Sequence, residues 1–188
     1  MLCLFGIQLQ AQQLTYYDAS CFPLLGKATQ DTGARYERLP DSLKNISRSP
    51  LWNLSRNSAG MAIRFRSNST RIALKWENLF NNHMNHMTDT GVKGLDLYCW
   101  ESNGKWRFVN SARPNGKTNQ ATIIANMQPK EREYMLYLPL YDAGGRKGSQ
   151  TRSTASRTAG IGCGGKRTII YLHNPYWERI CDRPGSTP

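Results

Sequence analysis

Apolar and polar residues alternate in short stretches along the chain, which predicts a succession of β-strands. Residues 59–66 and 70–76 show this alternation most clearly. The apolar positions are Met61, Ile63 and Phe65 in the first stretch, and Ile72, Leu74 and Trp76 in the second. Because residues 67–69 are Ser-Asn-Ser, the two stretches are predicted to pair as a hairpin. Its solvated face would carry four cations, Arg64, Arg66, Arg71 and Lys75.

A third stretch, Gly94-Leu95-Asp96-Leu97-Tyr98, extends to Trp100 and has two contrasting faces. Alternation places Leu95, Leu97 and Cys99 on one face, with Cys99 as an isolated buried thiol. It places Asp96, Tyr98 and Trp100 on the other, so a carboxylate and two amphipathic rings point together away from the core. This second face is predicted to contact a partner or a ligand. Alternatively, Asp96 accepts hydrogen bonds from residues 86–91 and fixes the start of the strand.

A polar loop, residues 81–90, precedes that strand and contains His83 and His86. The two histidines are three residues apart and Asp89 follows after three more, a spacing that would align metal ligands or catalytic groups on a helix. The surrounding asparagines and threonines favour turns over helix, and no third strong ligand has a recognisable spacing. We therefore expect neither a metal nor another cofactor, and expect a hydrogen-bonded His86 within a loop.

The remaining alternation and turn signals predict an all-β fold. Further strands are predicted at residues 14–20, 51–54, 106–110, 120–125 and 132–140, and one helical turn with Asp41 as its N-cap within residues 41–50. The Asn103-Gly104 step predicts a hairpin between residues 93–101 and 106–110. With about eight short strands and no long helix, residues 13–142 are predicted to form an antiparallel, jelly-roll-like β-sandwich. Residues 143–188 are predicted to be an irregular tail rich in Gly, Ser and Arg.

Length and charge fit one globular domain without a nucleic-acid partner. The chain has 188 residues, of which 39% are hydrophobic, and a net charge of +12. Half of that charge lies beyond residue 142, and the rest forms no stripe on a predicted helix. We therefore expect no nucleic-acid binding.

Residues 1–12 form a short apolar run that ends in small and polar residues, as the end of a secretory signal does. The run is too short to span a membrane as a helix. We expect a clipped export signal and a secreted or periplasmic protein, although no basic segment precedes the run and an ordinary N-terminal strand is the alternative. Export implies an oxidising compartment, but the count of five cysteines is odd, and Cys3 would be removed with the signal. The other four cysteines show no metal-ligand spacing.

Several blocks between residues 16 and 142 resemble, in the right order, the GxDLY domain, the N-terminal β-sandwich of secreted SGNH-type (GDSL-like) esterases. The blocks are Trp52-Asn53-Leu54-Ser55, Ser58-Ala59-Gly60, Ile63-Arg64-Phe65, His86-Met87, Gly91, Gly94-Leu95-Asp96-Leu97-Tyr98 and Leu136-Tyr137-Leu138-Pro139-Leu140-Tyr141. The resemblance implies that an α/β hydrolase domain follows and supplies a Gly-x-Ser nucleophile, an Asp and a His. It also implies that a strand such as residues 167–171 opens that domain, but the next residues, 172–175, contain no serine.

We therefore expect a non-catalytic accessory domain of an exported carboxylic-ester hydrolase, inactive alone, whose partner is an SGNH catalytic domain. Truncation, or a frame slip near the codon for Asp142, would account for the missing catalytic blocks. No catalytic residue is assigned, and the interface or ligand candidates are His86, Gly94, Asp96, Tyr98 and Trp100. The alternative is a free-standing carbohydrate-binding β-sandwich, in which exposed rings among Trp52, Trp76, Trp100 and Trp106 stack on sugars.

Overall fold

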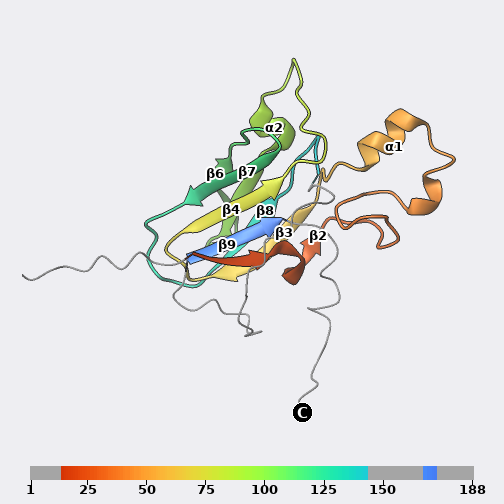
Figure 1. Cartoon of the computed structure of the whole chain (residues 1–188). Helices are drawn as coiled ribbons and strands as arrows, with labels where there is room; N and C mark the ends of the chain where they lie inside the picture. Colours follow the sequence, from red (N-terminus) through yellow and green to blue (C-terminus); the bar gives the residue numbers. More distant parts are fainter. Residues whose placement is uncertain (1–13, 144–166, 173–188) are drawn as a thin grey trace, which may run out of the picture.

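The computed structural model describes residues 14–143 and 167–172, which form two β-sheets packed around one core (Figure 1). The strands are β1 (Leu14–Asp18), β2 (Leu24–Leu25), β3 (Ala62–Ser67), β4 (Ile72–Glu77), β5 (Leu95–Trp100), β6 (Trp106–Ala112), β7 (Thr118–Ile124), β8 (Arg132–Tyr137) and β9 (Arg167–Leu172). The strand order is β1-β9-β4-β7 in one sheet and β2-β3-β8-β5-β6 in the other. The predicted all-β sandwich is confirmed.

The core lies between the two sheets and is built from the predicted apolar positions. The fully buried side chains include Met61, Ile63, Ile72, Leu74 and Leu136. Phe65 of β3 stacks on Tyr134 of β8, with ring centroids 5.3 Å apart. The alternation therefore identified the buried face of each of these strands correctly.

The predicted hairpin between β3 and β4 is wrong, because the two strands belong to different sheets. β3 pairs with β2 and β8, whereas β4 pairs with β7 and β9. Residues 67–69 thus carry the chain from one sheet to the other. The physical reason is that both strands turn an apolar face to the same core from opposite sides, and alternation specifies the buried face but not the neighbouring strand. Arg64 and Arg66 are exposed as predicted.

The predicted strand at residues 51–54 is also wrong, because these residues lie in the helix α1 (Ser49–Ser55). Pro50 lies in the first turn of this helix, where proline is favoured. The four residues of the predicted strand are too few to distinguish the helical period of 3.6 from the strand period of 2. The other short helices are η1 (Ala19–Cys21), η2 (Asp41–Leu43) and α2 (Asp89–Lys93). η2 confirms the helical turn predicted within residues 41–50, but its N-cap is Pro40 instead of Asp41.

β9 lies beyond the predicted boundary at residue 142 and nevertheless belongs to the sandwich. It pairs in parallel with β1 on one side and with β4 on the other, whereas the other strand pairs are antiparallel. The strand that the resemblance implied as the start of a hydrolase domain is therefore part of this sheet. The predicted signal segment and the rest of the tail lie outside the described residues. Among the helices of the described part, none is long and apolar enough to cross a membrane.

Candidate functional site

The two faces of β5 are as the sequence predicted. Leu95 and Leu97 are fully buried, whereas Asp96 and Tyr98 are partly exposed and Trp100 is exposed. β5 pairs with β6 across the Asn103-Gly104 turn, which confirms the predicted hairpin. Cys99 packs against the core but is only partly buried, in contrast to the predicted buried thiol. This partial burial raises the pKa of the thiol, so the reactive thiolate is disfavoured.

Five rings lie on the outer side of the β8-β5-β6 part of the sheet, and we call them the aromatic face. They are Tyr98, Trp100, Trp106, Phe108 and Tyr137. Tyr98 packs edge to face against both Phe108 and Tyr137, with centroid distances of 5.6 and 5.4 Å. Trp100 packs in the same way on Trp106 at 5.1 Å. Because Trp100, Phe108 and Tyr137 are 40–51% exposed, the aromatic face is an apolar surface open to solvent in the described part of the protein.

Asp96 borders the aromatic face and is tied to the neighbouring strand. Its Oδ1 accepts a hydrogen bond of 2.5 Å from the hydroxyl of Ser111, the residue opposite it on β6. This bond orients the carboxylate within the sheet. No hydrogen bond joins Asp96 to residues 86–91 in the part of the chain that the structure describes.

Gly94 is buried between α2 and β5, where the backbone approaches it closely. A Cβ atom at this position would overlap the carbonyl oxygen of Thr90 and lie 3.0 Å from that of Ala112. The Gly94 amide also donates a hydrogen bond to Thr90 O. Gly94 is therefore needed for close packing and offers no surface of its own to a partner.

The loop before β5 is organised by a buried lysine that the sequence analysis did not single out. Lys93 is fully buried, and its ammonium group donates to Asn81 Oδ1 at 2.8 Å and lies 3.3 Å from Asp89 Oδ2. His83 lies between them, with Nε2 at 3.1 Å from Lys93 Nζ and Nδ1 at 2.9 Å from Asp89 Oδ1. His86 is exposed and pairs with Asn85 Oδ1 at 3.0 Å. The described residues contain no group of His, Cys, Asp and Glu side chains that could hold a metal ion.

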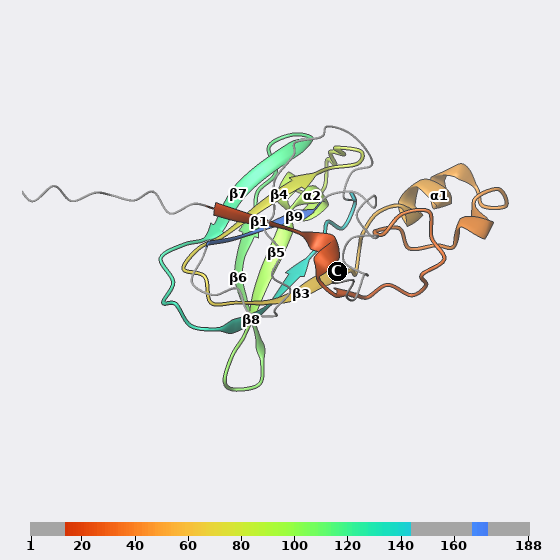
Figure 2. The same cartoon turned by 60° about the horizontal axis from the view of Figure 1, so that its bottom comes forward.

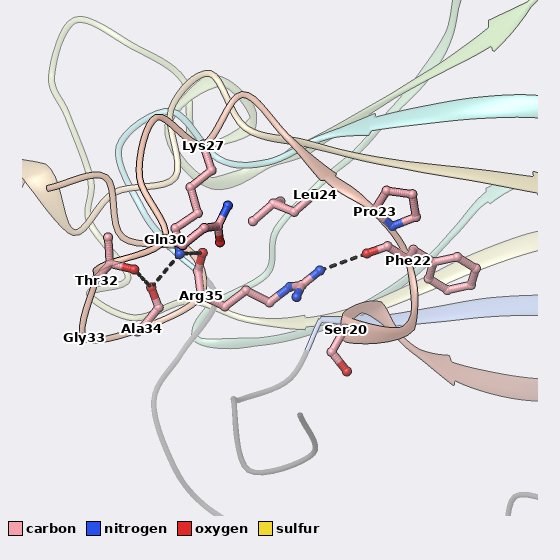
Figure 3. Close-up of a pocket in the computed structure, with 10 residues that line it drawn as sticks. All are labelled: Ser20, Phe22, Pro23, Leu24, Lys27, Gln30, Thr32, Gly33, Ala34 and Arg35. Atoms are coloured by element: carbon pink, nitrogen blue, oxygen red, sulfur yellow. Dashed lines mark hydrogen bonds between the residues drawn. The ribbon is translucent and has the colours of Figure 1, made fainter. Parts of the chain in front are cut away.

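A polar cavity of about 410 Å³ lies beside η1 and β2. Figure 3 shows Arg35 extended across it, with Nη2 donating to Phe22 O at 2.8 Å. Lys27 Nζ donates to Arg35 O at 2.9 Å. These two cations are the charged groups among the described lining residues, which are Ser20, Phe22, Pro23, Leu24, Lys27, Gln30, Thr32, Gly33, Ala34 and Arg35. The cavity is therefore electropositive, and nothing in the residue pattern of this loop distinguished it from ordinary surface.

A family comparison and a structural comparison relate the chain to one class of enzyme. The family described as GxDLY, the N-terminus of SGNH-hydrolase-type esterases, matches residues 14–144. The chain belongs to the GxDLY family. The match confirms the resemblance seen in the sequence, and the domain extends over both sheets of the described sandwich.

A solved structure has a similar fold to this GxDLY domain. It is a protein described as a GDSL-like lipase from Bacteroides ovatus, with 38% sequence identity and a TM-score of 0.62. The similarity covers 66% of this chain and 36% of the lipase. The chain thus matches about a third of that protein. No curated protein sequence matches the chain.

Proposed function

We propose that this GxDLY chain is the non-catalytic N-terminal accessory domain of an exported SGNH-type carboxylic-ester hydrolase. The family match over residues 14–144 is the observation that carries the proposal. Export is proposed from the apolar run in residues 1–12, as for a secreted or periplasmic protein. The ester bond would be hydrolysed by a separate SGNH domain, since about two thirds of the similar lipase has no counterpart in this chain.

The placement of the described histidines supports a non-catalytic role. A nucleophilic serine needs a base within hydrogen-bond distance and donors for the oxyanion. His83 is engaged by Asp89 and Lys93, and His86 by Asn85, so neither is hydrogen-bonded to a serine hydroxyl in the described ranges. The proposal therefore assigns nucleophile, base and oxyanion hole to the hydrolase domain.

The nucleotide sequence of the locus tests whether a hydrolase domain belongs to this chain. We expect one of the reading frames after the codon for Asp142 to encode a Gly-x-Ser block and, further on, an Asp and a His. If none of the three frames contains these blocks, the proposed link to an SGNH domain in cis is wrong.

A second candidate function is carbohydrate binding, which the exposure of the aromatic face favours. Trp100 is 43% exposed and stands beside Trp106, so its ring is open to stack on the apolar face of a sugar. Asp96 and Ser111 lie next to these rings and could bind sugar hydroxyls. Trp76, by contrast, is buried in the core and has no part in such a site.

Replacing Trp100 with alanine tests the carbohydrate hypothesis. If the aromatic face binds a glycan, the variant is expected to lose roughly fivefold in affinity on a glycan array, because one stacked ring contributes about 1 kcal/mol. Leu51→Ala is the control, since Leu51 is similarly exposed but lies on α1, away from this face. Absence of binding by the unmodified chain, or equal binding by both variants, would rule the hypothesis out.

A further inference from the structure

We propose that the hydrolase domain docks on one end of the β-sandwich and leaves the aromatic face uncovered. We call this surface the docking end and define it as η1, the segment 22–57 including α1, and the loop 78–93. The proposal rests on the proposed function, because it names the surface by which the accessory domain meets its SGNH partner. Four features of the described residues lead to it.

The first feature is the direction of β9, the last strand that the structure describes. β9 runs parallel to β1, and its residue Tyr171 is paired with Asp18, the last residue before η1. Its final residue, Leu172, is paired with Trp76 at the end of β4. In Figures 1 and 2 the β9 arrow points toward the side on which α1 lies. The C-terminal end of β9 therefore lies on the same side of the sandwich as η1 and α1.

The second feature is a set of exposed apolar side chains on the docking end. Leu51 and Leu54 on α1 are 48% and 47% exposed, and Ile46 between η2 and α1 is 78% exposed. Figure 1 shows α1 projecting from the body of the sandwich. Leu51 and Leu54 are three residues apart and therefore share one side of the helix. Such a projecting apolar edge is suited to insert into a groove of a partner domain.

The third feature is a concentration of buried polar atoms that lack a hydrogen bond. Within the described part of the chain these atoms include Ser20 Oγ, Arg38 Nε and Asn57 Oδ1, all of which belong to the docking end. Burial without a partner costs about 1–3 kcal/mol for each such group. Burial also raises the pKa of Tyr36, so its hydroxyl stays a neutral donor. The polar groups of this segment are therefore incompletely paired within the described part of the domain.

The fourth feature is the charge of the cavity at the docking end. Lys27 and Arg35 give it a positive potential, and Figure 3 shows the Arg35 guanidinium lying across it between Phe22 and Leu24. A carboxylate on the hydrolase domain would pair with Arg35 in a charge-assisted hydrogen bond. The docking end thus presents exposed apolar side chains and a cationic cavity that can bind a carboxylate of the same partner domain.

Side-chain contacts join the parts of the docking end to one another. Arg56 joins its parts, because its Nε lies 3.4 Å from Glu37 Oε1 and its guanidinium lies over the Phe80 ring at 5.1 Å. Lys93 holds the neighbouring loop through Asn81 and Asp89. The rings of the aromatic face, in contrast, pack edge to face on one another, and its carboxylate is already bonded to Ser111. The unsatisfied buried polar atoms thus lie at the docking end, whereas the carboxylate of the aromatic face has its hydrogen-bond partner.

Cysteine labelling tests which surface the hydrolase domain covers. Leu51→Cys and the matched control Phe108→Cys, whose native side chains are 48% and 51% exposed, are made with the five native cysteines changed to serine. Maleimide labelling rates are compared between the 188-residue chain and a hybrid in which this chain replaces the matching part of the Bacteroides ovatus lipase. Leu51→Cys is expected to label at least about tenfold more slowly in the hybrid, because an interface core excludes solvent. Phe108→Cys should label at the same rate in both proteins.

Equal labelling of Leu51→Cys in the chain and in the hybrid would overturn the proposal. So would protection of Phe108→Cys, with or without protection of Leu51→Cys, because it would place the hydrolase domain on the aromatic face. The hybrid is accepted as folded only if it hydrolyses p-nitrophenyl acetate. Otherwise the same comparison uses the intact lipase with cysteines at the positions aligned with Leu51 and Phe108. The accessory-domain proposal fails separately, if the chain alone hydrolyses esters through one of its own serines.

Discussion

The Gly94→Ala variant is expected to lose about 3 kcal/mol of the free energy of unfolding, because the new methyl group has no space. Its Cβ would overlap the carbonyl oxygen of Thr90 and press against that of Ala112, and neither backbone atom can move without displacing α2 or β6. The overlap would also weaken the hydrogen bond from the Gly94 amide to Thr90 O. Urea denaturation followed by tryptophan fluorescence measures the loss.

Gly104→Ala is the matched control for this prediction. Gly104 lies in the turn between β5 and β6 with φ of 77°, and a Cβ there would meet open space. The variant should therefore lose only roughly 1 kcal/mol of the free energy of unfolding, which is the cost of placing alanine in a left-handed backbone conformation. Equal losses in the two variants would show that crowding at Gly94 is not what requires glycine there.

The Asp142→Ala variant is expected to lose about 4 kcal/mol, because it leaves three backbone amides without an acceptor. Asp142 is fully buried at the last described residues before the tail. Its Oδ1 accepts from the amides of Phe80 at 3.0 Å and Ala143 at 2.8 Å, and its Oδ2 accepts from Asn82 at 3.3 Å. The carboxylate therefore holds the start of the loop 78–93 against the end of the sandwich through hydrogen bonds. The same denaturation experiment measures the effect.

Two further substitutions serve as comparisons for the Asp142→Ala variant. Asp142→Asn keeps one acceptor oxygen and should lose about half as much as the alanine variant. Asp41→Ala removes an exposed carboxylate from η2 and should change stability by less than about 0.5 kcal/mol. A loss at Asp142→Ala as small as at Asp41→Ala would mean that the carboxylate does not hold this loop.

Alternation along the sequence predicted the buried faces of the strands because burial is a local property of a pleated strand. Ile63 and Leu74 are buried as their periodicity indicated, and Asp96 and Tyr98 face outward. The hairpin at Asn103-Gly104 was predictable because its turn needs a left-handed residue, which Gly104 supplies with φ of 77°. Strand pairing was not predictable in the same way, because β3 and β4 present similar apolar faces to one core from opposite sheets.

The docking end could be predicted only in part. The apolar residues Leu51 and Leu54 predict a strand, although Pro50 at the start of the segment is a helix signal that identifies α1. The burial of Lys93 could not be predicted from the neighbouring sequence, because its partners Asn81 and Asp89 contact it only in the folded loop. The two outward-facing groups Tyr98 and Trp100 were found, and they share one surface with rings from β6 and β8.

The serine reactivity of the chain alone tests the central claim most directly. The purified 188-residue chain is incubated with a fluorophosphonate probe, which labels activated serines, and its turnover of p-nitrophenyl acetate is followed. The Bacteroides ovatus lipase serves as the positive control. An accessory domain should show neither labelling nor turnover above that of the heat-denatured chain. Labelling and turnover that a single Ser→Ala substitution abolishes would contradict the account.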